Sequence, residues 1–269
     1  MSTYLYGITR TDHPALPERT PGVGDPPCPV RAVRQGELAA LVSDCPAEPP
    51  TERRDLLAHQ RVLTETGSAG VVLPLPFGTL SEDDESVRAL LAERPEHYLE
   101  QLRGLDGRIE YNVKAVHREE ALLRQIAEQE PGVRARLEAD RAAGGGSLQE
   151  RRQLAELTAN AVRAREVRDA QQAERLLAPC ADLHTPGGEG AGWLLNLSFL
   201  LCRDATEDFV EAYRRLEKDN PRLELHITGP LPPYSFVRPA HADRTPHADR
   251  REHGRRDRPG RNPGGPSGS

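Results

Sequence analysis

Glycine-rich stretches are the first places to look for phosphate binding or nucleophilic catalysis, and this sequence has two. Residues 188–192 read Gly-Glu-Gly-Ala-Gly but precede an apolar run predicted as a strand, whereas a dinucleotide-binding loop follows a strand and opens a helix. Residues 67–70 read Gly-Ser-Ala-Gly, in which glycine adjoins serine directly, unlike a nucleophile elbow. No Gly-Lys-Ser/Thr triplet exists, which excludes a P-loop. Both glycine runs therefore indicate hairpins or connectors.

Metal ligands and catalytic side chains are equally dispersed. The four cysteines, which have no C-x-x-C spacing, are Cys28, Cys45, Cys180 and Cys202. This pattern is typical of reduced structural thiols in a reducing cytoplasm and not of a zinc site. His59 lies beside apolar positions of a predicted helix, so we expect a buried, hydrogen-bonded imidazole and not a general base. The sequence therefore predicts no catalytic residue, no cofactor and no metal.

The elements of the first half follow from hydrophobic periodicity. Strands are predicted at 4–8, 37–43, 71–75 and 108–116, and helices at 51–66, 81–94 and 95–103. Pro74 and Pro76 cannot donate ladder hydrogen bonds, so we expect the strand at 71–75 to lie at a sheet edge or to end in an irregular segment. In the strand at 108–116, alternation turns Tyr111 and Val113 inward and Glu110 outward. Helices interleaved with short strands predict an α+β sandwich of one sheet under two helices.

The middle of the chain is predicted to be helical, and the end returns to β-structure. Helices at 117–130 and 133–143 precede a Ser-x-x-Glu capping box at 147–150, which opens a long helix. Its narrow apolar stripe suits either a helical hairpin with residues 118–142 or packing on its own domain. That stripe comprises Leu154, Leu157, Ala161, Ala164 and Val167. A central buried strand is predicted at 192–202, and an alternating strand at 223–227.

Two proline-rich apolar segments remain without a chemical role. Residues 73–79 read Leu-Pro-Leu-Pro-Phe-Gly-Thr, and residues 229–237 read Gly-Pro-Leu-Pro-Pro-Tyr-Ser-Phe-Val. Prolines hold the backbone extended, and aromatic side chains anchor it. Such segments either fix the end of a sheet or present a low-entropy surface to a partner. The candidate partner-binding residues are Phe77, Gly78, Tyr234 and Phe236.

These segments and the motifs between them resemble the gas vesicle protein F/L family of accessory proteins in gas vesicle formation. The resemblance covers about residues 3–237. It rests on the opening at 4–8, the helix with His59 leading to 72–79, the motifs at 110–114 and 194–200, and the closing segment at 229–237. The sequence departs at Pro76, where family members often have arginine, and at Leu231, where they often have tryptophan.

The resemblance implies two domains: an N-terminal ferredoxin-like sandwich at 1–117, and at 118–237 a second α+β domain with an added long helical hairpin. It also implies a non-enzymatic protein that binds the small hydrophobic gas vesicle shell protein, as an assembly adaptor or minor shell component. Other gas vesicle accessory proteins are expected partners, and the cytoplasm and the gas vesicle are the expected locations. A shell subunit that exposes apolar surface needs a soluble escort.

Charge and composition bear on the remaining alternatives. Residues 238–269 carry eight arginines and four acidic residues, a net charge of +4, which leaves -10 for residues 1–237. This tail lacks large aliphatic residues, so we predict a disordered basic tail. No apolar stretch approaches the length of a membrane span, and we expect no membrane partner.

Two other functions remain open at this point. An RNA-binding module would stack bases on Tyr4 and Tyr6, but an acidic body argues against phosphate binding, so we expect no nucleic-acid partner. An enzyme acting on a small organic ligand in a ferredoxin-like cleft would need a pocket with convergent polar groups. We expect no small-molecule substrate.

Overall fold

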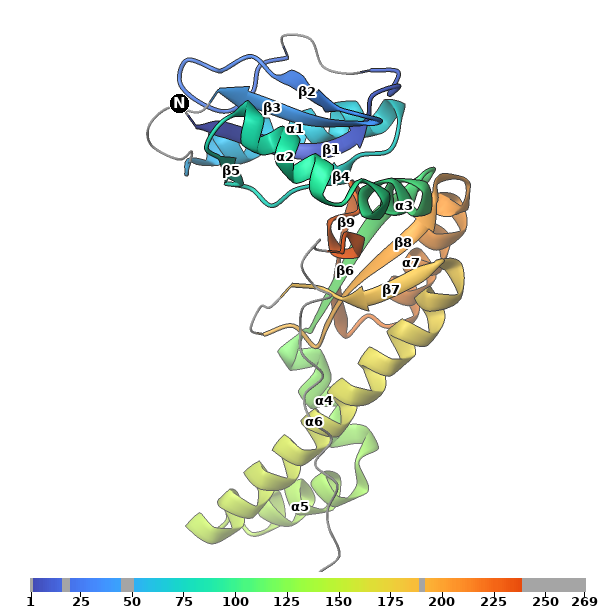
Figure 1. Ribbon diagram of the computed structural model, residues 1–269. Helices are drawn as coiled ribbons and strands as arrows, with labels where there is room; N and C mark the ends of the chain where they lie inside the picture. Colours follow the sequence, from blue (N-terminus) through green and yellow to red (C-terminus); the bar gives the residue numbers. More distant parts are fainter. Residues whose placement is uncertain (1, 16–19, 45–50, 189–191, 239–269) are drawn as a thin grey trace, which may run out of the picture. The chain divides into compact units, whose positions relative to one another are not determined.

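Two antiparallel sheets organise the computed structural model, which describes residues 2–15, 20–44, 51–188 and 192–238 (Figure 1). Residues 1–238 form one compact unit. The basic tail predicted at 238–269 lies outside the described residues except for Arg238, and Cys45 lies outside them too. The mixed helix-and-sheet architecture confirms the predicted α+β class.

The first sheet has the strand order β2-β3-β1-β4, with β5 also pairing with β1. Its strands are β1 (Thr3–Arg10), β2 (Arg31–Gln35), β3 (Leu38–Asp44), β4 (Leu73–Pro74) and β5 (Leu80–Ser81). The helices of this half are α1 (Arg53–Ala69), α2 (Asp84–Glu93) and α3 (Pro95–Leu105). As predicted, proline-containing β4 lies at an edge. The sequence patterns missed β2, a short strand with only one fully buried residue, Val33.

The second sheet has the order β7-β8-β6-β9. Its strands are β6 (Arg108–His117), β7 (Leu183–Pro186), β8 (Leu195–Cys202) and β9 (Leu223–Leu231). The helices are α4 (Glu119–Gln129), α5 (Pro131–Ala142), α6 (Leu148–Leu177) and α7 (Thr206–Asp219). Short 3-10 turns lie at η1 (Ala178–Cys180), η2 (Arg203–Ala205) and η3 (Tyr234–Phe236). The apolar strand β8 occupies an interior position, as its pattern predicts.

Both sheets share one topology. Numbered along the chain within each sheet, the strands are arranged 2-3-1-4 with antiparallel neighbours, the order of a ferredoxin-like split βαβ sandwich. The second sheet has a helical connection at both crossovers, namely α4–α6 and then α7. In the first sheet, the residues between β1 and β2 contain no described helix, so only the α1 crossover is present. The complete ferredoxin-like connectivity therefore belongs to the C-terminal sheet.

The strand at 108–116 requires a correction. The sequence assigns it to an N-terminal unit ending at residue 117, but β6 pairs with β8 and β9 at the centre of the second sheet. Its inward residues Tyr111 and Val113 join a core that contains Phe199 and Phe209. Alternation identifies a strand and its buried face, but not the strands that it pairs with. The division into domains at residue 117 remains a prediction, since residues 1–238 form one unit.

Of the two packing arrangements that the sequence allowed for the long helix, the structure shows the helical hairpin. Helix α6 runs beside α4 and α5 (Figure 1). Leu154 and Ala161 of α6 pack against a cluster built on Leu122 and Ile126 of α4 and Val133 of α5. The predicted capping box at Ser147 and Glu150 is present. Three residues of the predicted stripe do not contribute to this contact face: Ala164 is exposed, and Leu157 and Val167 are 43% and 57% exposed.

A buried charged cluster joins α6 to the second sheet. The carboxylate of Asp169, 2% exposed, accepts hydrogen bonds from Arg222 at 2.6 and 2.8 Å and from His117 Nε2 at 2.9 Å. Arg165 lies 3.2 Å away on the same helix. Burial alone would raise the pKa of Asp169, but the donors from Arg222 and His117 outweigh it and hold that pKa well below its ordinary value.

We predict that Asp169→Asn destabilises the protein by about 3–5 kcal/mol, because the buried guanidinium of Arg222 loses its charged partner. The wild-type contribution is present above pH ~4, where an unfolded aspartate ionises, and is lost as the pH falls below that value. Urea unfolding at pH 7 and at lower pH measures both effects. Asp140→Asn, which removes no ion pair among the described residues, is the control; equal stability of the two variants would contradict the prediction.

Candidate functional site

The two proline-rich segments converge on one hydrophobic core. Phe77 and Tyr234 are both half-buried, and both pack against the cluster that contains Tyr4, Tyr6 and Leu63. They are 157 positions apart in the sequence. The structure therefore packs two of the four predicted site residues against the same core. Their spacing along the chain does not predict this.

The side chain of His59 holds the first proline-rich segment, residues 73–79, through hydrogen bonds. Its ring is 1% exposed, with Nε2 3.2 Å from the carbonyl of Leu75 and Nδ1 2.9 Å from the hydroxyl of Tyr4. That hydroxyl also accepts a hydrogen bond from the backbone N–H of Gly78, at 3.1 Å. Burial lowers the pKa of His59 to about 4, against a weaker opposing effect of the Leu75 carbonyl. The neutral ring therefore donates to Leu75 and accepts from Tyr4, as the sequence-based expectation of a buried imidazole requires.

We predict that this burial makes stability depend on pH between ~6.5 and 4. The unfolded chain binds a proton at residue 59 in this range while the folded protein does not, so stability falls by about 3 kcal/mol as the pH is lowered. A His59→Gln variant lacks this contribution, whereas the exposed His226→Gln control retains it. Chemical denaturation at a series of pH values is the measurement, and the same pH slope in wild type and His59→Gln would refute the account.

A buried carboxylate anchors the second segment. Glu110, predicted to face outward, is 3% exposed. Its oxygens accept hydrogen bonds from the Ser235 backbone N–H at 2.8 Å and from the Ser235 hydroxyl at 2.7 Å. The Ser235 hydroxyl also lies 3.0 Å from that of Ser198 on β8. Burial, with a smaller effect from Glu110, raises the pKa of the neighbouring Tyr234 well above its ordinary value, so its hydroxyl is neutral.

Contacts on either side of Glu110 complete this attachment. A Cβ atom on Gly229 would collide with the ring of Tyr111, so only glycine allows the backbone of β9 to lie against that ring. Asn112 donates to Asn196 at 3.0 Å and to Ser198 at 3.2 Å across the β6–β8 pair. The motifs at 110–114, 194–200 and 229–237 therefore contact one another in the folded protein.

A double-mutant cycle tests the anchor. We predict that Glu110→Gln and Ser235→Ala are each destabilising, with a coupling free energy of about 1.5–3 kcal/mol, because they share charge-assisted hydrogen bonds in a buried site. Urea unfolding of the two single variants, the double variant and the wild type gives this coupling. The exposed Arg10 and Asp12 pair provides the matched control cycle, with little coupling expected. Strictly additive effects at Glu110 and Ser235 would contradict the assignment.

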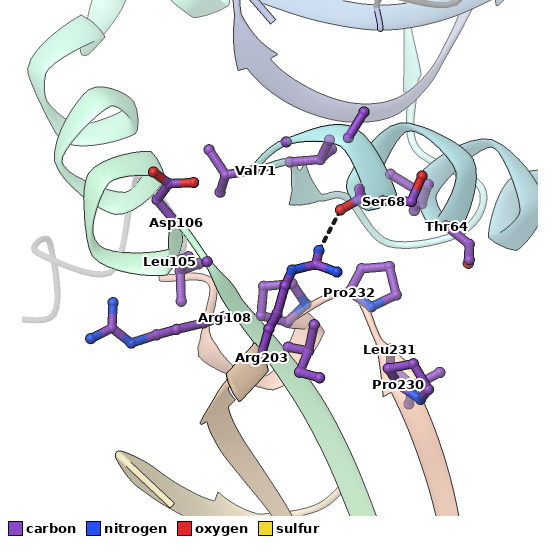
Figure 2. A pocket seen from close by; sticks show the side chains of 18 residues that line it. Thr64, Ser68, Val71, Leu105, Asp106, Arg108, Arg203, Pro230, Leu231 and Pro232 are labelled. Carbon is purple, nitrogen blue, oxygen red and sulfur yellow. Dashed lines mark hydrogen bonds between the residues drawn. The ribbon is translucent and has the colours of Figure 1, made fainter. Parts of the chain in front are cut away.

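Residues 230–233 of the anchored segment form one wall of a cavity of about 280 Å³ (Figure 2). The opposite wall is the end of α1 with the residues after it, 67–72, and the third is the junction of α3 and β6, 105–109. Most of the lining is aliphatic or proline. Arg203 enters from the end of β8 and donates to the carbonyl of Gly67 at 2.6 Å. Arg108 instead pairs with Asp182 at 2.7 Å, and Figure 2 shows its side chain pointing away from the cavity.

Phe236 lies apart from this cavity. It lines a second, more open one of about 610 Å³ with Leu183, Leu200 and Arg238. The backbone carbonyl of Arg238 accepts a hydrogen bond from Gln101 at 3.1 Å, and its N–H donates to the same side chain at 2.6 Å. Of the four predicted residues, Gly78 is exposed, and Phe77, Tyr234 and Phe236 are half-buried. Phe77 and Tyr234 thus share one supporting core and Phe236 lines the second cavity, whereas none of the four residues lines the first.

Several site features escaped sequence analysis. Glu110 was missed because alternation predicts the open face of a sheet, while a distant segment covers it here. Arg203 and Asp106 follow apolar elements and carry no motif. Their only sequence signal is their position, because Asp106 directly follows α3 and Arg203 directly follows β8.

The described residues show neither a metal centre nor a membrane span. Among residues 2–15, 20–44, 51–188 and 192–238, no three histidine, cysteine or acidic side chains are close enough together to hold a metal ion. No helix within the same ranges has the length and apolar character needed to cross a bilayer.

The family model described as "Gas vesicle synthesis protein GvpL/GvpF" matches residues 2–238. The chain belongs to the GvpL/GvpF family. This membership confirms the resemblance found in the sequence motifs, and the match ends where the basic tail begins. It gives the protein an accessory role in gas vesicle formation.

Individual relatives agree with the family match. Gas vesicle protein F of Streptomyces sp. (strain CB03234) is 52% identical over 237 residues, covering 88% of this chain and 100% of the relative. Gas vesicle protein L of the same strain is 32% identical, covering 89% of this chain and 94% of the relative. The crystal structure of GvpF from Anabaena sp. PCC7120 superposes with a TM-score of 0.74 at 25% identity, covering 89% and 99% of the two chains. GvpF from Microcystis aeruginosa, at 22% identity and a TM-score of 0.65, supports the fold.

Proposed function

We propose that this protein is a non-enzymatic accessory factor that binds the small hydrophobic gas vesicle shell protein, as an assembly adaptor or minor shell component. Membership of the GvpL/GvpF family supports the gas vesicle role. We further propose that it acts in the cytoplasm and on the gas vesicle, together with other gas vesicle accessory proteins.

The observation that carries the proposal is the fixing of both proline-rich segments at the protein surface. His59 and Tyr4 hold the segment around Gly78, and Glu110 holds the segment around Ser235. Surfaces that are rigid before binding lose little conformational entropy when a partner docks. An apolar partner thus finds a preformed surface, in which Gly78 is exposed and half-buried Phe236 lines an open cavity, while Phe77 and Tyr234 are supports that pack on the core.

The chemistry of the cavity in Figure 2 favours contact over catalysis. Its hydroxyl-bearing lining residues are Thr64 and Ser68, and the Ser68 hydroxyl donates to the carbonyl of Glu65 at 2.7 Å. No histidine lies among the described lining residues to activate either hydroxyl. Its aliphatic and proline walls suit an apolar partner group better than a polar substrate.

Co-purification with the shell protein tests this function. We predict that the tagged wild-type protein retains the shell protein in cells that express both, and that Phe236→Ala reduces the retained amount at least tenfold, because truncating a central aromatic contact removes most of its binding energy. Leu148→Ala, at a 76% exposed position of the hairpin, is the matched control and should bind like wild type.

Thermal denaturation of each variant separates contact from support. Phe236→Ala should melt near the wild-type temperature, whereas Tyr234→Ala should lose stability as well as binding, because Tyr234 packs on the core. Failure of the wild-type protein to retain the shell protein, or equal retention by Phe236→Ala, would overturn the proposed function or its assigned surface, respectively.

A further inference from the structure

Strand β9 forms an open edge of the second sheet. In the order β7-β8-β6-β9 it pairs with β6 on one side, and no other strand among the described residues pairs with its opposite side. Such an edge presents a row of backbone N–H and C=O groups that can pair with another extended chain. The side chains of Glu224 and His226 on this strand are 46% and 48% exposed, so they are accessible to a chain that adds there.

The other edge strands carry features that oppose pairing. Strand β7 has four residues and ends at Pro186, whereas β4 and β5 have only two residues each. Strand β2 carries two basic side chains, Arg31 and Arg34, within five residues. Short strands, prolines and basic side chains are devices that prevent edge-to-edge association. Residues 223–228 of β9 contain no proline, glycine, lysine or arginine, so among the described edges this one is the most open to a further strand.

The residues that bound β9 set the register of such a pairing. Pro221 precedes the strand, and Gly229 with Pro230 follows its regular part, where the pairing with β6 also shifts register. Leu225 is the midpoint of this run, four residues from Pro221 and four from Gly229. When a second copy of the chain adds antiparallel, the register that uses the whole run therefore places Leu225 opposite the Leu225 of the other copy.

This register is self-complementary in charge. The positions directly before and after Leu225 face each other, so Glu224 of each copy lies opposite His226 of the other. An imidazole N–H donates to a carboxylate in either charge state of the ring, and the two-fold axis produces this contact twice. Within its own sheet, His226 is paired with Lys114 of β6. Because that neighbour is a cation, an acidic neighbour on the free side of His226 is favoured.

The apolar face of β9 matches in the same register. Leu223 of one copy comes opposite Ile227 of the other. Leu223 belongs to the core of the second sheet, and Ile227 packs against that core but remains only half-buried. Contact between the two aliphatic side chains therefore removes further apolar surface from water.

We propose that β9 is a homodimer interface, at which a second copy of this chain adds an antiparallel strand with Leu225 on the two-fold axis. The two four-stranded sheets then form one continuous sheet across both copies. Residues 229–237 lie outside the paired run, so a dimer carries the proposed contact surface twice. Dimerisation needs no shell protein, and it is therefore independent of the proposed function.

Analytical ultracentrifugation of the purified full-length protein tests the interface. We expect a reversible monomer–dimer equilibrium in the micromolar range. His226→Glu should weaken dimerisation about tenfold, because two Glu–Glu pairs replace two Glu–His pairs. The charge-swapped variant that combines Glu224→Arg with His226→Glu should restore it. Gln35→Glu, which adds a carboxylate to an exposed position of edge strand β2, is the matched control and should dimerise like wild type.

Thermal denaturation of the same variants checks that each one folds, and all should melt near the wild-type temperature because the substituted side chains are about half exposed or more. A wild-type monomer throughout the micromolar range would overturn the inference. Equal dimerisation by wild type and His226→Glu, equal weakening by Gln35→Glu, or no recovery in the charge-swapped variant would overturn it as well.

Disulfide trapping tests the register. Glu224→Cys and His226→Cys proteins, mixed under mild oxidation, should become linked between positions 224 and 226, because directly opposed residues of an antiparallel pair bring their Cβ atoms within disulfide reach. Each variant alone should link far less, since identical positions then lie diagonally apart. Peptide mapping, with wild-type protein as the control, separates this link from disulfides of the exposed native Cys202. Absence of the 224–226 link, or equal linking by either variant alone, would refute the proposed pairing.

Discussion

A buried carboxylate on β6 is the constraint on which the proposed contact surface depends. Glu110 is removed from water and relies on two donors of Ser235, which lies 125 positions further along the chain. An ionised group in this position is stable only while its hydrogen-bond partners stay in place, since an unpaired buried charge costs several kcal/mol. The requirement fixes the closing segment against the second sheet. It thereby also fixes the wall of prolines in the cavity and the ring of Tyr234 against the core of the first sheet.

The closing segment thereby connects the two sheets. The C-terminal segment starts on β9 of the second sheet, forms a cavity wall with the ends of α1 and α3, and then places Tyr234 on the core of the first sheet. Arg203 adds a direct hydrogen bond to the carbonyl of Gly67. The hairpin of α4, α5 and α6 has its own small core and its own attachment through Asp169. The protein thus combines a proline-rich surface with a separate helical hairpin, and the chain as a whole belongs to a gas vesicle family.

Local patterns predicted most elements but not how they pair. Ser147 and Glu150 located the start of α6, Pro74 located an edge strand, and the neighbours of His59 indicated its burial, because each depends on nearby residues. The sheet to which β6 belongs and the burial of Glu110 depend on segments far along the chain, and no local pattern encodes them. The four proposed contact residues were identified by motif, whereas the cavity beside them needs three distant segments to meet.

Hydrogen–deuterium exchange of the full-length protein, alone and with the shell protein bound, tests most directly the claim that function resides in contact at the proline-rich surface. The account predicts slower exchange on binding for the amides of residues 67–72 and 105–109, which line the first cavity, and of Phe236 and Arg238, which line the second. It predicts unchanged exchange for the hairpin tip around residue 148. Protection confined to the hairpin, with no change at these cavity residues, would contradict the central claim.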